Sequence, residues 1–295
     1  MTSFWGKKAP VLMGTILCLG LSGLQNSFAT QETSPPTQNQ LITNYDLYWK
    51  GIRVVTADST LTIKPETYDH QMTWRTRGML SWFVKGKTNA NARGLLNANF
   101  SPQAEHYSSD GKWGKRTFER SVVYGTDGKG SLASITDPWG DENEREPVPE
   151  GLDVGPDPVT LALLLMKIPV DLGQDQDTLT LTSYDGIRSM AYDVTCKEAL
   201  QPLRNTGHST YRGLAKECII KARQTGGFST APREEEEKDP REDHGMSLLF
   251  QKLVGENLYV PVQGTFTTRD GTLKLYLTAI NKPIQEIEPE IKALP

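Results

Sequence analysis

Residues 41–76 read LITNYDLYWKGIRVVTADSTLTIKPETYDHQMTWRT, and apolar and polar side chains alternate along most of this stretch. A period of two is typical of β-strands that bury one face and expose the other. The alternation is interrupted at Gly51 and again at Lys64-Pro65-Glu66, where we expect turns. Strands joined by turns this short favour an antiparallel meander.

The same pattern of short strands and turns continues along the rest of the chain. We expect turns at Ser109-Asp110-Gly111, Thr126-Asp127-Gly128 and Arg269-Asp270-Gly271. Further strands are expected at residues 116–124, 178–182, 187–196, 217–223, 246–254, 258–267 and 273–280. The fold class is therefore mostly β, and we place it in a single domain over residues 41–282.

One segment, residues 158–168, predicts a helix instead. Asp157 is suited to the N-cap, Pro158 to the first helical position, and Pro169 ends the segment. The segment is apolar on all sides because it carries Leu161, Leu163, Leu164, Leu165 and Met166. A helix of this composition must be covered by protein, so we expect it to be embedded in the β domain.

The first 29 residues have the pattern of a cleavable secretory signal. Lys7 and Lys8 precede an uncharged apolar run over residues 11–24, and small residues then lead to a cleavage site after Ala29. A membrane anchor is the alternative, but the run is shorter than the roughly 20 residues that a spanning helix needs. Lipidation at Cys18 is a weaker alternative because Leu17 precedes it. We therefore expect a mature periplasmic chain that begins at Thr30, without a transmembrane segment.

The net charge argues against certain binding partners, and the cysteine content indicates the compartment. The full chain has a formal net charge of −4, which becomes −6 once Lys7 and Lys8 are removed with the signal. This sign argues against nucleic acid and against binding anionic lipid by charge alone. The mature chain keeps Cys196 and Cys218, and an even pair in an exported protein predicts a disulfide. Two separate buried thiols are the alternative.

No segment carries a recognisable catalytic or metal-binding motif. The four histidines are not arranged as in metalloproteases, and no nucleophile elbow, phosphate loop or dinucleotide fingerprint occurs. His70 lies on a predicted strand among apolar residues, where a structural role is expected. The acidic runs around residues 141–146 and 234–237 are typical of solvated loops. We therefore expect a non-enzymatic protein without a cofactor or a metal, and a hydrolase with no recognisable motif remains an alternative.

The two ends of the mature chain are expected to be less ordered than its centre. Residues 30–40 (TQETSPPTQNQ) are polar and contain two prolines, as in a disordered leader. Residues 283–295 are expected to form a loosely held tail.

Three segments carry a resemblance to a known family: NYDLYWKGIRVVTADSTL (44–61), RGMLSWFV (77–84) and EREPVPEGLDVGPDPVTLALLLMK (144–167). They resemble a bacterial exported family known as domain of unknown function 3108, over roughly residues 44–280. The resemblance implies a curved antiparallel sheet around a helix, similar in outline to the open half-barrels that carry lipoproteins between membranes. It also implies a Gram-negative-type periplasm, and it brings no catalytic residues.

Pattern and resemblance together predict an open or half β-barrel with an embedded apolar helix. A curved sheet that does not close has a concave apolar face, which can bind a lipid or another apolar envelope component or be filled by the helix. The residues expected to line this interior are Trp49, Leu61, Trp74, Trp82, Leu161 and Leu165. The alternative is a scaffolding role through contacts with other envelope proteins, without a small ligand.

Overall fold

The structure is a computed structural model, and the predicted signal lies outside the residues that it describes. Those residues are 39–78, 80–83, 85–97, 100–136, 145–168, 178–230, 244–268 and 271–285. The acidic runs at 141–144 and 234–237 also lie outside them.

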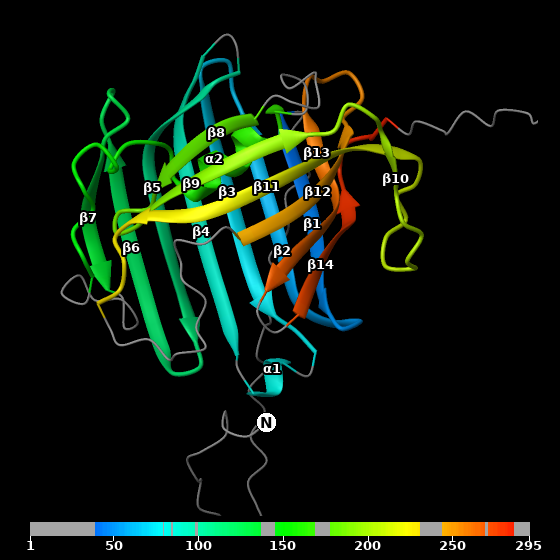
Figure 1. Ribbon diagram of the computed structural model, residues 1–295, viewed down its shortest axis with the longest axis horizontal. Coiled ribbons are helices and arrows are strands. Elements are labelled where there is room, and N and C mark those ends of the chain that lie inside the picture. Colours follow the sequence, from blue (N-terminus) through cyan, green and yellow to red (C-terminus); the bar gives the residue numbers. More distant parts are fainter. Residues whose placement is uncertain are drawn as a thin grey trace, which may run out of the picture. The chain divides into compact units, whose positions relative to one another are not determined.

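The described chain is built mainly from β-strands (Figure 1). The strands of the N-terminal half are β1 (Gln40–Trp49), β2 (Ile52–Ile63), β3 (Thr67–Thr76), β4 (Gly86–Leu96), β5 (Pro102–Trp113), β6 (Arg116–Tyr124) and β7 (Gly130–Thr136). Those of the C-terminal half are β8 (Thr178–Tyr184), β9 (Ser189–Cys196), β10 (Gln201–Pro202), β11 (Leu214–Gly226), β12 (His244–Lys252), β13 (Tyr259–Thr268) and β14 (Gly271–Ile280). Two short helices, α1 (Leu80–Phe83) and α2 (Pro158–Leu165), complete the set.

The strands form one antiparallel sheet in the order β7-β6-β5-β4-β3-β2-β1-β14-β13-β12-β11-β9-β8, with β10 paired to β11. Almost every neighbour in the sheet is also a neighbour in the sequence, as expected for a meander. The first and last strands join its two halves, since Tyr45 of β1 lies opposite Leu277 of β14. The meander predicted from residues 41–76 is confirmed.

The first hairpin shows how local sequence determines the strand boundaries. Lys50 and Gly51 have φ angles of 49° and 81°, and Trp49 pairs with Ile52 across them. Two consecutive residues with positive φ match the twist of the flanking strands, and glycine adopts this conformation without strain. Tyr45 and Ala57 are buried and face each other on β1 and β2, so the predicted alternation places apolar side chains on the inner face.

The sheet curls until β6, near one edge, approaches β8 at the other edge. Tyr124 Oη donates a hydrogen bond of 2.5 Å to the carbonyl oxygen of Tyr184, and Arg120 Nη1 lies 2.8 Å from Asp185 Oδ2. The result is a nearly closed, barrel-like sheet, whereas an open or half β-barrel was predicted. The physical reason is that polar side chains of β6 bond to the chain around the end of β8, which a pattern of apolar residues does not reveal.

The helix α2 begins as the sequence predicts. Asp157 Oδ1 accepts hydrogen bonds of 2.8 Å from the amides of Val159 and Thr160, and Pro158 follows the cap. The helix ends at Leu165, three residues earlier than expected. It contacts β3, β4 and β5, and also β8.

Two clusters of buried apolar side chains stabilise the fold. The larger one includes Leu61, Tyr107 and Val122 from the N-terminal strands together with Val159 and Leu163 of α2. The smaller one is formed by Ile168 with Val194, Cys196, Cys218, Ile220, Leu248 and Phe250. Cys196 and Cys218 lie opposite each other on β9 and β11 and are joined by a disulfide, as predicted.

Two local expectations differ from the structure. Ser109-Asp110-Gly111 lies within β5 and is not a turn, and the hairpin turn comes after Trp113. A Cβ on Gly111 would lie 2.6 Å from the Phe118 ring, so this glycine allows close packing inside a strand. Residues 283–285 of the predicted loose tail are paired, because Ile284 forms a bridge with Leu253.

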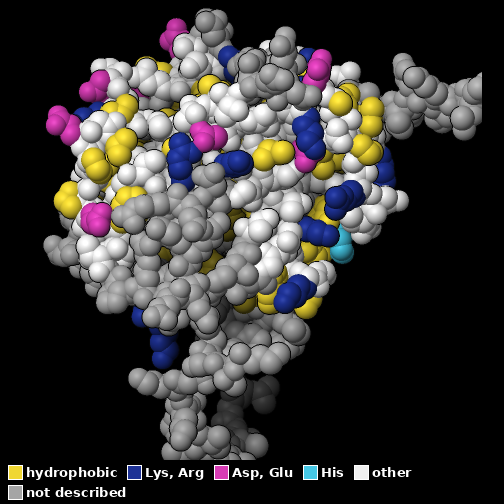
Figure 2. Space-filling model, in the orientation of Figure 1, with side chains coloured by type: hydrophobic (Ala, Val, Ile, Leu, Met, Phe, Trp, Pro, Cys, Tyr) yellow, Lys and Arg dark blue, Asp and Glu magenta, His cyan; other side chains and the backbone are white. Residues whose placement is uncertain are grey.

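The face drawn in Figure 2 mixes basic, acidic and hydrophobic side chains. Within the described ranges, no helix has the length and apolar character needed to cross a membrane.

Candidate functional site

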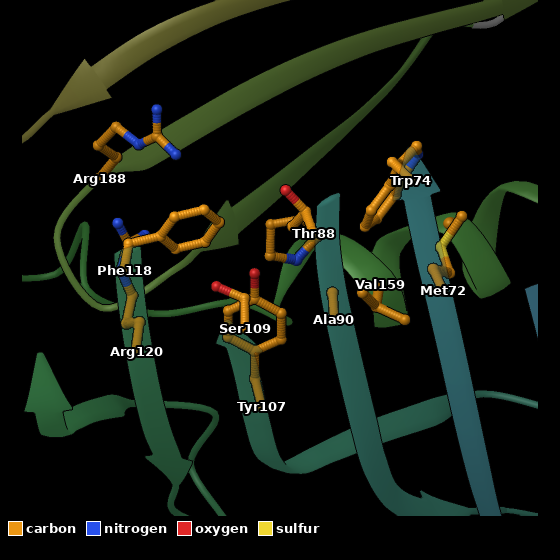
Figure 3. A pocket seen from close by; sticks show the side chains of 12 residues that line it. Met72, Trp74, Thr88, Ala90, Tyr107, Ser109, Phe118, Arg120, Val159 and Arg188 are labelled. Carbon is orange, nitrogen blue, oxygen red and sulfur yellow. The ribbon is translucent and has the colours of Figure 1, made fainter. Parts of the chain in front are cut away.

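A cavity of about 370 Å³ lies on the inner side of the sheet (Figure 3). It is bounded by β3, β4, β5 and β6, by the first turn of α2, and by Arg188 just before β9. Its volume is within the range of roughly 300–1,000 Å³ that is common for small-molecule sites.

Small inward-facing residues on β4 and β5 make the hollow. Ala90 lies opposite Ser109, and Thr88 lies opposite Gly111. Because successive residues of a strand point to opposite faces, these four share the inner face. Thr88, Ala90 and Ser109 line the cavity, and larger side chains there would fill the space that it occupies. The space beside Gly111 is already taken by the Phe118 ring.

The rest of the wall is largely apolar. Met72 and Trp74 come from β3, Phe118 from β6, and Val159 and Ala162 from α2. Met72 and Trp74 are only partly buried, so they present surface to the cavity. In Figure 3 they lie on the side opposite to Arg120 and Arg188.

The other side of the cavity is charged. Asp185 Oδ2 lies 2.8 Å from Arg120 Nη1 and 2.7 Å from Arg188 Nη2. The carboxylate of Asp185 also accepts hydrogen bonds from the amides of Ile187 and Arg188, at 3.2 and 2.8 Å. Burial alone would raise the pKa of Asp185, but Arg188 and Arg120 outweigh it and hold that pKa below its ordinary value.

A second polar group, at the start of α2, adjoins the apolar wall. Thr160 Oγ1 donates a hydrogen bond of 2.5 Å to Asp157 Oδ2, and Tyr68 Oη lies 2.6 Å from the same hydroxyl. Asp157 is fully buried, and this burial raises its pKa to about 6 despite the hydrogen bonds that favour its charged form. The network attaches α2 to β3.

His70 is buried beside this network. Its Nε2 lies 2.9 Å from Ser59 Oγ on β2. Burial lowers the pKa of His70 to about 4, and a contact with the backbone of Val159 offsets this only in part. The imidazole is therefore neutral near pH 7 and packs in the core, in line with the structural role expected from its apolar neighbours.

Comparison with protein families identifies the chain. The family described as "Protein of unknown function (DUF3108)" matches residues 44–278. The chain belongs to this family. A comparison with curated proteins found no match. Among solved structures, this DUF3108 chain is similar to a β-barrel-like protein of domain of unknown function DUF1849 from Brucella abortus, with a TM-score of 0.47 and 13% identity over 83% of this chain and 97% of that one.

The DUF3108 fold places four of the six predicted interior residues in or near the core. Trp74 lines the cavity directly, and Leu61 is buried in the larger cluster. Leu161 is buried in α2, and Leu165 packs against the smaller cluster. Their role as ligand contacts stays a prediction.

The other two predicted residues lie elsewhere. Trp49 is at the end of β1, where Lys50 Nζ sits 4.5 Å from the centre of its ring. It is therefore part of the first hairpin and is absent from the residues that line the cavity. Trp82 belongs to α1, and its side chain lies outside the described residues.

The charged residues of the site were missed by sequence reasoning. Arg120 occupies an inward position of β6, two residues from Phe118 and two from Val122. A charged residue among the apolar, inward-facing residues of a strand is the sequence signal that could have identified Arg120. Across the described ranges, no group of three or more His, Cys, Asp or Glu side chains is arranged to hold a metal ion.

Proposed function

We propose that this protein is an exported, periplasmic, non-enzymatic envelope protein that binds a lipid or another apolar ligand inside its curved sheet. The observation that carries the proposal is the cavity of about 370 Å³ with Met72, Trp74, Phe118 and Val159 in its wall. Apolar surface kept at a hollow rather than packed into the core is typical of small-molecule sites.

The position of the helix supports the same reading. α2 covers part of the inner face, where Leu163 is buried, while Ala162 and Val159 face the remaining space. In this proposal α2 is the embedded element that fills one part of the barrel and leaves the other part for a ligand.

Two features support export to an oxidising compartment. The pattern of residues 1–29 is that of a cleavable signal, and the disulfide between Cys196 and Cys218 is typical of exported proteins. The buried titratable groups support a non-enzymatic role, because His70 and Asp157 are engaged with Ser59 and with the start of α2.

Ligand binding is tested by filling the cavity. We would purify the wild-type protein and Ala162→Phe from the periplasm of the native host, extract both with organic solvent, and identify co-purified lipids by mass spectrometry. Ala199→Phe is the matched control, because Ala199 lies in an exposed turn.

We expect an apolar ligand in the wild type and in Ala199→Phe, and strongly reduced occupancy in Ala162→Phe. A ligand-free wild-type protein that also takes up no lipid when loaded in vitro would overturn the binding proposal. It would favour a scaffolding role through protein contacts.

Export is tested separately. Cell fractionation followed by N-terminal sequencing should recover the protein in the periplasm with Thr30 as its first residue. Recovery of an unprocessed chain from the cytoplasm would contradict the proposal.

A further inference from the structure

The cavity has a charged side and an apolar side. Arg120 of β6 and Arg188 both line it, whereas Met72 and Trp74 line the opposite side (Figure 3). The Arg120 side chain is 10% exposed and the Arg188 side chain is 45% exposed. The arginines therefore extend from the protein interior to solvent on this side of the cavity.

Both guanidinium groups are held in place by one carboxylate. Asp185 Oδ2 contacts Arg120 Nη1 at 2.8 Å and Arg188 Nη2 at 2.7 Å, and Arg188 Nε donates a further hydrogen bond of 3.0 Å to the same oxygen. Asp185 is itself fixed by the backbone amides of its turn. The three side chains together carry one net positive charge, with Arg120 and Asp185 shielded from water and Arg188 partly exposed.

A guanidinium group held in this way suits a particular ligand chemistry. Its planar array of N–H donors matches carboxylate and phosphate oxygens, and charge-assisted hydrogen bonds are about twice as strong as neutral ones. Interactions of this kind are also stronger where protein replaces water. An anionic group would therefore be favoured at the Arg188 side of the cavity over a neutral or cationic one.

The volume limits the apolar part of the ligand. At roughly 30 Å³ each, about a dozen water molecules would fill 370 Å³. A methylene group is of similar size, so the space accommodates one hydrocarbon chain of about a dozen carbons.

We propose that the cavity binds a single-chain anionic amphiphile, with its carboxylate or phosphate at Arg188 and Arg120 and its chain along Met72, Trp74 and Val159. This inference rests on the proposed function, because it assigns the ligand class of the same cavity. The carboxylate and the phosphate share the chemistry that the arginines recognise.

Binding to the purified mature protein tests the proposal. We would titrate dodecanoate, dodecyl phosphate, dodecyltrimethylammonium and dodecyl maltoside below their micelle concentrations and follow binding by calorimetry and by tryptophan fluorescence. Acetate and inorganic phosphate serve as headgroup-only probes. The variants are Arg188→Gln and Arg188→Lys.

The matched control is Arg75→Gln. Arg75 follows Trp74 on β3 and so points to the outer face. It is 39% exposed and pairs with Asp58, which makes it similar to Arg188 in exposure and in having a carboxylate partner. Thermal melting of each variant establishes that it is folded.

We expect dodecanoate or dodecyl phosphate to bind at least about tenfold more tightly than the neutral and cationic amphiphiles. Arg188→Gln should weaken anionic binding by about tenfold, Arg188→Lys should weaken it less, and Arg75→Gln should leave it unchanged. Preference for the carboxylate or for the phosphate assigns the headgroup. The wild-type comparison alone tests the proposal if Arg188→Gln fails to fold.

Two failures are distinguishable. Binding of all four amphiphiles with equal affinity, or equal losses in Arg188→Gln and Arg75→Gln, would overturn the headgroup assignment and leave the proposed function standing. Absence of binding by every amphiphile would overturn both.

Discussion

Asp157 allows a direct test of burial at the start of α2. A single substitution can remove its ionisable group and still leave a residue that caps the helix. The carboxylate is buried at the N-terminus of α2 and accepts hydrogen bonds from the amides of Val159 and Thr160. Burial raises its pKa from 3.8 to about 6. Asparagine is also a good N-cap residue, so Asp157→Asn keeps the cap and removes the ionisation.

The raised pKa of Asp157 determines how its contribution to the free energy of unfolding changes with pH. A shift from 3.8 to about 6 corresponds to about 3 kcal/mol. Because the folded protein binds this proton more tightly than the unfolded chain, the stabilisation is fully present below pH 3.8 and is lost as the pH rises through 6. Asp157→Asn has no such loss. Its free energy of unfolding, relative to wild type, should therefore rise by about 3 kcal/mol between about pH 3.5 and 7.

Urea unfolding at a series of pH values measures this difference directly. Asp69→Asn, on the outer face of β3, provides the baseline for losing a carboxylate from the surface. If the difference between Asp157→Asn and wild type were the same at every pH, the reasoning about burial at the cap would be refuted.

His70 should give the opposite sign. Its pKa falls from 6.5 to about 4 in the folded protein, so the stabilisation is present above pH 6.5 and is lost as the pH falls through 4. The free energy of unfolding of His70→Gln, relative to that of wild type, should therefore rise by about 3 kcal/mol as the pH falls from about 7 to 4. Opposite pH dependences of stability in Asp157→Asn and His70→Gln would show that these two buried groups titrate separately from general acid unfolding. The same pH dependence in both variants would contradict the pKa shifts of Asp157 and His70.

Three further substitutions test other parts of the fold by urea unfolding. Replacing both Cys196 and Cys218 by serine should lower the free energy of unfolding by about 3 kcal/mol, and two reactive thiols in the unreduced, unfolded mature protein would disprove the disulfide. Gly111→Ala should cost about 1–3 kcal/mol because its Cβ meets backbone and an aromatic ring, so an unchanged stability would show that the strand is not packed this closely. Asp185→Asn should cost about 3–5 kcal/mol because Arg120 stays buried beside a neutral group, and a loss below about 1 kcal/mol would contradict the buried ion pair.

Sequence reasoning succeeded where structure is set by neighbours along the chain. The alternation around Tyr45 and Ala57 and the break at Gly51 depend on residues a few positions apart, and the structure confirms the resulting hairpin. The cap at Asp157 is confirmed for the same reason. The pattern failed at Gly111, where a turn-like triplet lies inside β5 because the ring of Phe118 on the neighbouring strand requires the space.

The cavity was harder to predict because it forms where inward-facing side chains are small. Ala90 and Ser109 look unremarkable in sequence, and only their pairing across β4 and β5 on the inner face makes a hollow. Trp74 was found because large apolar residues on an inward face signal an interior. Trp49 does not line the cavity, because it lies at the end of β1, where it pairs with Leu273 of β14 and Lys50 Nζ sits over its ring.

The sequence by itself determined the β class, the family, the first hairpin and the cap of the helix, since all of these depend on short-range pattern or on recognisable segments. Only the tertiary structure decided that the sheet nearly closes and that Arg120 and Arg188 meet at one carboxylate beside a cavity. The reason is physical: the curl of the sheet is the sum of small twists over many strands. The position of β6 relative to the turn before β9 therefore depends on the whole sheet and on no single segment.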